Sequence, residues 1–297
     1  MKDPMGDTWE LEELLAVFDV EPLGSDRFCA AAGPERLRSA DATRAMIDGS
    51  QILGQAVVAA SRAESGRFVK SAHMIFARAA SAAAPIELLV ERIHSGRSFS
   101  SLSIRALQGE RLCASGLLLL DDHAPNTLHH SASAPRVCRP EEAAPFELPV
   151  RGRELRVVSG ADYAQPDAVG PPSLDVWVRY ERAPKDLAIR QALLAHLCGP
   201  FSIGVAMRPH PGYGETQAHR AMSTGVLSLT VHFHEPCTLE GWLLYGHESV
   251  HAGRGLCDGV GRIFADGERL VASFAQEGML RPLRSGQISG MRAAEVL

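Results

Sequence analysis

The chain has 297 residues, of which 45% are hydrophobic and 22% charged, and its formal net charge is −5. This composition is typical of a globular protein, and the length allows two domains that each bury a core. The acidic balance gives no positive field that would gather a polyanion, so we expect no nucleic-acid partner. No apolar run reaches 18 residues, so we expect no transmembrane segment and no membrane partner.

The cysteines and the first residues bear on the compartment. Six cysteines are scattered without a Cys-x-x-Cys pair, which is typical of reduced thiols. The first residues are acidic where a signal peptide would be basic and then apolar. We therefore expect a cytoplasmic protein, and the absence of dinucleotide, P-loop and GxSxG patterns leads us to expect no cofactor.

The first half predicts one long helix followed by a meander of strands. A short amphipathic helix is expected over 10–18 and a strand over 28–32. Asp48-Gly49-Ser50 is an N-cap signal before an apolar run over 51–60, which predicts a buried helix. Strands are expected over 69–77, 85–94, 98–107 and 111–120. This order indicates an α+β domain over 9–120, with the helix packed on an antiparallel sheet.

The second half repeats this order. Residues 121–150 are rich in Pro, His, Ala and Glu, and we expect them to form a linker. In the second domain, over 151–283, we expect strands, an apolar helix over 187–197 that Gly199-Pro200 would end, and a strand over 223–233. Residues 284–297 are expected to be a flexible tail.

An internal repeat supports this division. Pairs of identical residues lie 157 positions apart in the two halves: Glu91 and Glu248, His94 and His251, Gly96 and Gly253, and Arg97 and Arg254. Repeats the size of a domain indicate duplication rather than a solenoid.

The second copy contains His247-Glu248-Ser249-Val250-His251, the HExxH pattern of zinc peptidases. That site requires a helix, which would place both histidines on one face. Here the preceding residues are strand-like and the glycines after them would break a helix, so we expect a strand without metal. Cross-strand packing is likewise favoured over a four-histidine cluster with His232 and His234.

Gln276 is the polar residue that the copies do not share, because its counterpart is Leu118. Two interpretations have similar weight. The amide could lie in a pocket and hold a water or a carbonyl, or it could lie on a solvent-exposed face of the last strand.

Several blocks together resemble the type II acyl-CoA thioesterases, the bacterial TesB-like family. The resemblance extends from about Leu11 to Leu283 and implies a tandem (double) hotdog fold with joined sheets. Its blocks are Gly49-Ser50-Gln51-Ile52-Leu53-Gly54-Gln55, Gly96-x-Ser98-Phe99-Ser100, Phe233-His234-x-Pro236, Trp242-Leu243-Leu244-Tyr245 and Val271-Ala272-Ser273-x-x-Gln276-Glu277-Gly278.

The resemblance implies hydrolysis of acyl-CoA to CoA and free fatty acid by a water molecule. In the family an Asp, a Thr and a Gln orient that water. Gln276 matches the Gln, whereas the Asp position falls at Gly199 and the Thr position at Val226. Because of these two differences, the alternative is a non-catalytic acyl-CoA-binding or scaffold protein of the same fold.

Other residues are candidates for the missing groups. Thr224 and Ser228 share the face of Val226 if the strand alternates regularly, and His73 is the nearest base of the first half. Arg97 and Arg254 are candidates for binding the phosphates of CoA, with Gly199 as a further substrate contact. Hotdog proteins commonly associate through sheet edges, so a homo-oligomer is expected.

Overall fold

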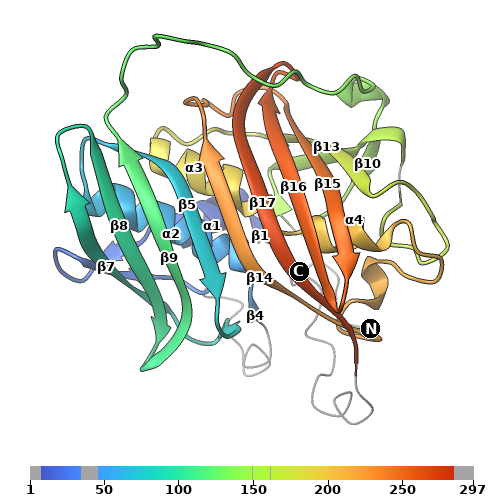
Figure 1. Cartoon of the computed structure of the whole chain (residues 1–297), viewed down its shortest axis with the longest axis horizontal. Coiled ribbons are helices and arrows are strands. Elements are labelled where there is room, and N and C mark those ends of the chain that lie inside the picture. Colours follow the sequence, from blue (N-terminus) through green and yellow to red (C-terminus); the bar gives the residue numbers. More distant parts are fainter. Residues whose placement is uncertain (1–7, 35–45, 149, 161, 284–297) are drawn as a thin grey trace.

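The computed structural model of the chain describes residues 8–34, 46–148, 150–160 and 162–283. The expected flexible tail over 284–297 lies outside these residues. One sheet of thirteen strands dominates the described part, in the order β10-β12-β13-β15-β16-β17-β14-β5-β9-β8-β7-β3-β2. Figure 1 looks onto the open face of this sheet, and the helices α1, α2 and α3 lie behind it.

The helices are α1 (Leu11–Phe18), α2 (Gly49–Ala63), α3 (Leu187–His196) and α4 (Ser202–Met207). The strands of the first half are β1 (Trp9–Glu10), β2 (Glu21–Pro22), β3 (Arg27–Ala30), β4 (Met46–Ile47), β5 (Phe68–Phe76), β6 (Ala80–Ser81), β7 (Ile86–Ser95), β8 (Phe99–Gln108) and β9 (Arg111–Asp121). Those of the second half are β10 (Ala144–Phe146), β11 (Val150–Arg151), β12 (Arg153–Val157), β13 (Ser173–Tyr180), β14 (Met222–Phe233), β15 (Leu243–Gly253), β16 (Leu256–Ala265) and β17 (Arg269–Pro282).

The two halves join at the centre of the sheet. Strand β14 pairs antiparallel with β5, from Ser228 opposite Ile75 to His232 opposite Ser71. This confirms the expected arrangement of two helix-on-sheet units with continuous sheets. The segment between β9 and β10 arches over one end of the sheet in Figure 1. The last part of the expected linker over 121–150 is not free, because β10 pairs with β12 at the sheet edge.

Helices α2 and α3 pack against each other between the sheet and α1. A Cβ atom on Gly54 of α2 would lie 3.2 Å from the Cβ of Ala192 and 2.6 Å from the Phe18 ring, so only glycine permits this approach. Contacts on several sides explain why α2 is apolar almost all round. None of the helices in the described residues has the length and apolar character needed to cross a bilayer.

Both helices begin with the same cap. The side chain of Asp48 accepts a hydrogen bond from the backbone of Ser50 at the start of α2. The side chain of Asp186 accepts one from Ala188 at the start of α3. These caps satisfy backbone N–H groups that a helix leaves without partners. The two N-termini are therefore alike in local structure and can be compared by what surrounds them.

Candidate active site

Gln276 lies on β17, on the face of the sheet that the helices cover. Its neighbours in register are Leu229 on β14 and Gly259 on β16, and the residue is 3% exposed. Oriented to satisfy its surroundings, the amide nitrogen donates to the carbonyl oxygens of Gly199 at 3.1 Å and Cys198 at 3.3 Å. The interpretation of Gln276 as a solvent-exposed residue is therefore wrong.

The acceptors of Gln276 belong to the turn between α3 and α4. α3 ends at His196, and Ser202 begins α4. The Ser202 hydroxyl donates to the Cys198 carbonyl at 3.3 Å, the same oxygen that accepts from Gln276. The turn is thus held from the sheet by an amide and from α4 by a hydroxyl.

The N-terminus of α2 contacts the same turn from the other domain. The Ser50 hydroxyl donates to the His196 carbonyl at 2.7 Å and also to the carboxylate of Asp48. A Cβ on Gly199 would lie 3.1 Å from the Ser50 Cβ and 3.4 Å from Asp48 Oδ1. A carboxyl group of the first half therefore lies beside the turn that Gln276 holds.

Asp48 is only partly exposed, and desolvation is the main influence on its carboxyl group. Loss of solvent raises the pKa of Asp48, and hydrogen bonds from Ser50 and the Gln51 backbone oppose this shift. No ion pair with Asp48 is present among the described residues. Sequence reasoning identified Asp48 only as a helix cap, because nothing in the spacing connects residue 48 with residue 199.

Thr224 shares a face with Gln276 but lies too far along the sheet. It is opposite Leu280, four residues beyond Gln276 on β17, which corresponds to about 13 Å. Its hydroxyl lies 3.4 Å from Nε2 of His219. The structure therefore does not bring Thr224 to the turn at Gly199.

Ser228 and His73 lie on the opposite face. A β-bulge between Val226 and Ser228 reverses the alternation on which the expectation for Ser228 depended. The Ser228 hydroxyl donates to exposed Glu277 at 2.8 Å. His73 is exposed on the open face, where its Nδ1 lies 2.7 Å from Thr230 Oγ1. The expectation that Ser228 shares the face of Val226 is wrong. His73, the candidate base of the first half, lies on the open face and not on the face of Gln276.

Arg97 and Arg254 do not converge on one ligand. Both are exposed, and each lies on a hairpin, Arg97 between β7 and β8 and Arg254 between β15 and β16. Strand register places the first hairpin level with Phe68 at the start of β5 and the second level with Gly225 near the start of β14. Because β5 and β14 are antiparallel, these hairpins lie at opposite ends of the sheet.

The HExxH sequence lies on β15, in agreement with the sequence analysis. His247 is 3% exposed and packs between the rings of Phe201 and Phe274, with centroids at 5.3 and 5.0 Å, and burial lowers the pKa of His247 to about 3. Glu248 and His251 are exposed. Within the described ranges, no group of three or more His, Cys, Asp or Glu side chains could hold a metal ion.

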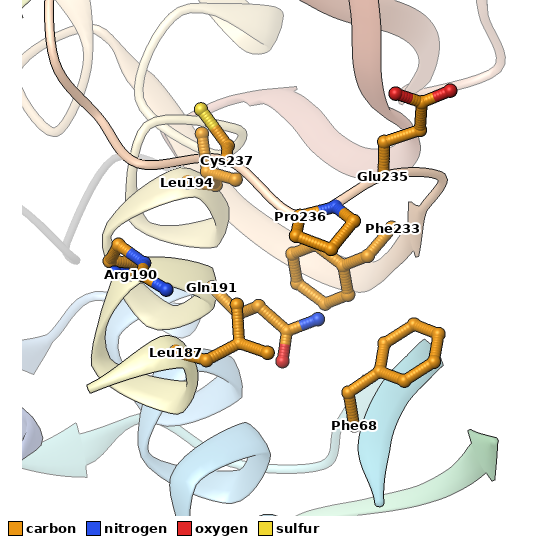
Figure 2. A pocket seen from close by; sticks show the side chains of 9 residues that line it. All are labelled: Phe68, Leu187, Arg190, Gln191, Leu194, Phe233, Glu235, Pro236 and Cys237. Carbon is orange, nitrogen blue, oxygen red and sulfur yellow. The ribbon is translucent and has the colours of Figure 1, made fainter. Parts of the chain in front are cut away.

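The N-terminus of α3 offers a comparison with that of α2. Figure 2 shows the small cavity beside it, which is lined by Phe68, Leu187, Arg190, Gln191, Leu194, Phe233, Glu235, Pro236 and Cys237. Phe233 corresponds to Phe76 in the repeat, and the Phe76 ring lies against Gly49 at the start of α2. Of the two helix N-termini, only that of α2 lies next to Gln276 and the turn at Gly199.

Comparisons with known proteins agree with this architecture. Profiles of the acyl-CoA thioesterase N-terminal and C-terminal domain families match residues 39–120 and 121–280. Acyl-coenzyme A thioesterase 8 of Homo sapiens is 28% identical over 313 aligned positions, which cover 94% of this chain and 92% of that protein.

Two solved structures share the fold. The tesB protein of Mycobacterium avium subs paratuberculosis has a TM-score of 0.76 at 24% identity, covering 92% of this chain and 100% of that chain. A hot dog fold protein from Alicyclobacillus acidocaldarius has a TM-score of 0.71 at 17% identity, covering 91% of this chain and 98% of that chain. The fold is therefore the double hotdog, and the chain belongs to the acyl-CoA thioesterase family.

Proposed function

We propose that the chain hydrolyses acyl-CoA thioesters to CoA and free fatty acid, with Gln276 in the catalytic centre. One observation carries this proposal: a buried amide, present in only one of the two copies, is fixed on the turn that faces the N-terminus of α2. Ligand sites place a few polar groups among apolar side chains, and Gln276 is such a group. Membership of the family, and the name of the human relative, support the same reaction.

The chemistry uses water as the nucleophile. A bond forms between the water oxygen and the acyl carbon, the C–S bond breaks, and a proton from the water ends on the CoA sulfur. Gln276 orients the reacting groups at the turn. The N-terminus of α2 carries the positive end of the helix dipole, which favours the negative oxygen that develops on the acyl carbon.

A thiol-release assay over acyl-CoA substrates of short to long chain length tests the proposal. We expect turnover by the wild type and a decrease in kcat of about 10²- to 10³-fold in Gln276→Ala, as for other groups that stabilise a transition state. Ser228→Ala, on the opposite face, is the control. Saturable binding of a non-hydrolysable acyl-CoA without any turnover would instead select the non-catalytic binding protein.

We also propose a cytoplasmic, homo-oligomeric protein. All six cysteines are free, which suits a reducing compartment. The open face of the sheet exposes apolar side chains near its centre, including Ile75 at 56% and Leu117 at 58%. Cell fractionation tests the location. Light scattering after size-exclusion chromatography tests the assembly, and a monomer at micromolar concentration would contradict it.

A further inference from the structure

We propose that Asp48, a residue of the first domain, supplies the carboxylate of the catalytic centre in the second domain. In this role Asp48 binds the attacking water next to the turn at Gly199 that Gln276 holds, and it accepts a proton from this water. The inference rests on the proposed hydrolysis and adds the group that acts as general base.

Asp48 lies beside the turn at Gly199, close to the groups that Gln276 holds. A Cβ built on Gly199 would lie 3.4 Å from Asp48 Oδ1, and the Gly199 carbonyl accepts from Gln276 at 3.1 Å. The carboxyl of Asp48 therefore lies beside the residue of the turn that accepts from the Gln276 amide, and the two groups come from different domains. Ser50 fixes this arrangement, because its hydroxyl bonds both the Asp48 carboxylate and the His196 carbonyl.

Other titratable groups at the turn cannot act as a base. Desolvation and the nearby charge of Arg153 lower the pKa of His196 to about 3, so its imidazole is a poor proton acceptor. Burial raises the pKa of the Cys198 thiol well above its usual value, which keeps it protonated. Asp48 is a carboxyl group whose pKa desolvation raises, and this makes it a stronger base.

Helix capping alone does not explain where Asp48 lies. Asp186 caps α3 by the same hydrogen bond and remains exposed. Removing a carboxylate from water costs free energy, and no ion pair compensates Asp48 in the described part of the chain. The capping carboxylate of Asp48 is desolvated beside Gly199, at a cost in stability. This indicates a second role for Asp48, because functional sites retain groups that destabilise the fold.

Gly199 and Ser50 are matched to this position of the carboxylate. A side chain at residue 199 would meet the Ser50 Cβ at 3.1 Å, which is tighter than an ordinary contact. Replacing Ser50 by glycine would remove the 3.1 Å contact, so we expect an Asp at residue 199 to have room beside the present position of the Asp48 carboxylate. Moving the carboxylate to the second domain would therefore take three substitutions.

The proposed step is balanced. The water oxygen bonds to the acyl carbon while one water proton passes to the Asp48 carboxylate. The tetrahedral intermediate then expels the sulfur of CoA, which takes the proton from the Asp48 carboxyl group. Asp48 returns to the carboxylate, and the products are the fatty acid and the CoA thiol.

Asp48→Asn tests the inference, and Asp186→Asn is the matched control. Asn is as good a cap as Asp, so the fold is kept, which melting temperatures check. We expect Asp48→Asn to lower kcat by about 100-fold or more with KM within about twofold of the wild type, and Asp186→Asn to leave kcat unchanged. An Asp48→Asn kcat within about twofold of an active wild type would overturn the inference and leave the proposed function intact. A wild type without thiol release would overturn both.

The relocated variant Asp48→Ser/Ser50→Gly/Gly199→Asp adds a readout that a structural role would not produce. Ser keeps the cap and, being shorter, leaves space for the new side chain. We expect kcat to recover to within about tenfold of the wild type, and a folded variant no more active than Asp48→Asn would contradict the inference. If this variant does not fold, the pH profile of Asp48→Asn decides: its residual kcat should lose the acidic limb, and retention of that limb would contradict the inference.

Discussion

The N-termini of α2 and α3 have the same local structure and different surroundings. Asp48 and Asp186 each cap their helix by accepting a hydrogen bond from the backbone N–H two residues later. Asp48 lies beside the turn that Gln276 holds, whereas Asp186 is exposed and directly precedes Leu187, one of the residues that line the cavity in Figure 2. On β9, the counterpart of Gln276 is the buried Leu118. The duplication thus provides two equivalent frameworks with polar contacts between the domains at both. At α3, Gln191 donates to the Val69 carbonyl of the first half at 2.7 Å, whereas at α2 the capping carboxylate itself lies beside a turn of the other domain.

The largest effect is expected when Gln276, beside the turn at Gly199, is made apolar like the equivalent position of the first half. Gln276→Leu copies Leu118 and removes the amide that holds the carbonyls of Cys198 and Gly199. We expect kcat to fall by about 10²- to 10³-fold because the turn and the water lose their orientation. Steady-state thiol release measures this. Gln276→Leu with at least half the wild-type kcat would show that the difference between the copies is not catalytic.

A smaller effect on kcat is expected from adding a side chain at residue 199, where the turn approaches the start of α2. Gly199→Ala places a methyl group 3.1 Å from the Ser50 Cβ and 3.4 Å from Asp48 Oδ1, so we expect the carboxylate to move and kcat to fall by about tenfold. Ser50→Gly removes the closer of these contacts, but it also removes the hydroxyl that holds the Asp48 carboxylate, so we expect this single variant to lose activity as well. The two single variants and the double variant form a cycle, and strictly additive effects would argue against direct contact.

Stability should depend on the titration of Asp48 at the start of α2. Because the pKa of Asp48 is raised in the folded protein, its favourable contribution is present below the unfolded pKa and is lost as pH rises through the folded pKa. We therefore expect Asp48→Asn to melt higher than the wild type at neutral pH, by about 2–4 °C for each kcal/mol recovered. This difference should vanish below about pH 4. A lower melting temperature of Asp48→Asn at neutral pH would contradict this account.

At α3 the cap should matter for stability alone. Asp186→Ala removes the hydrogen bond to Ala188 and should cost about 1 kcal/mol of unfolding free energy, with kcat unchanged. Denaturant unfolding together with thiol release tests both statements. Loss of activity in a folded Asp186→Ala protein would mean that both helix N-termini take part in catalysis.

The smallest effects are expected on the open face. His73→Ala removes an exposed side chain whose partner is Thr230, and we expect unfolding free energy to change by less than about 0.5 kcal/mol. We expect kcat to stay within about twofold of the wild type, because the sheet separates His73 from Gln276. A large loss of kcat would place chemistry on the face that the helices leave uncovered.

Sequence reasoning reached the architecture because local patterns determine it. The apolar runs of α2 and α3, their Asp and Gly boundaries, and the repeat were sufficient for two helix-on-sheet units. The bulge between Val226 and Ser228 could not be predicted from the sequence, because one extra residue leaves the composition of the strand unchanged. Its effect is large, since every later side chain of the strand moves to the other face. The approach of Asp48 to Gly199 depends on the packing of α2 against α3, which no local pattern contains.

The role of Asp48 as general base is tested by the kcat of Asp48→Asn, measured by thiol release at neutral pH beside Asp186→Asn. We expect a decrease of about 100-fold or more at Asp48, with KM and folding preserved, and no change at Asp186. Equal kcat values for the two variants would contradict it, because the two capping aspartates would then differ only in their surroundings and not in their roles.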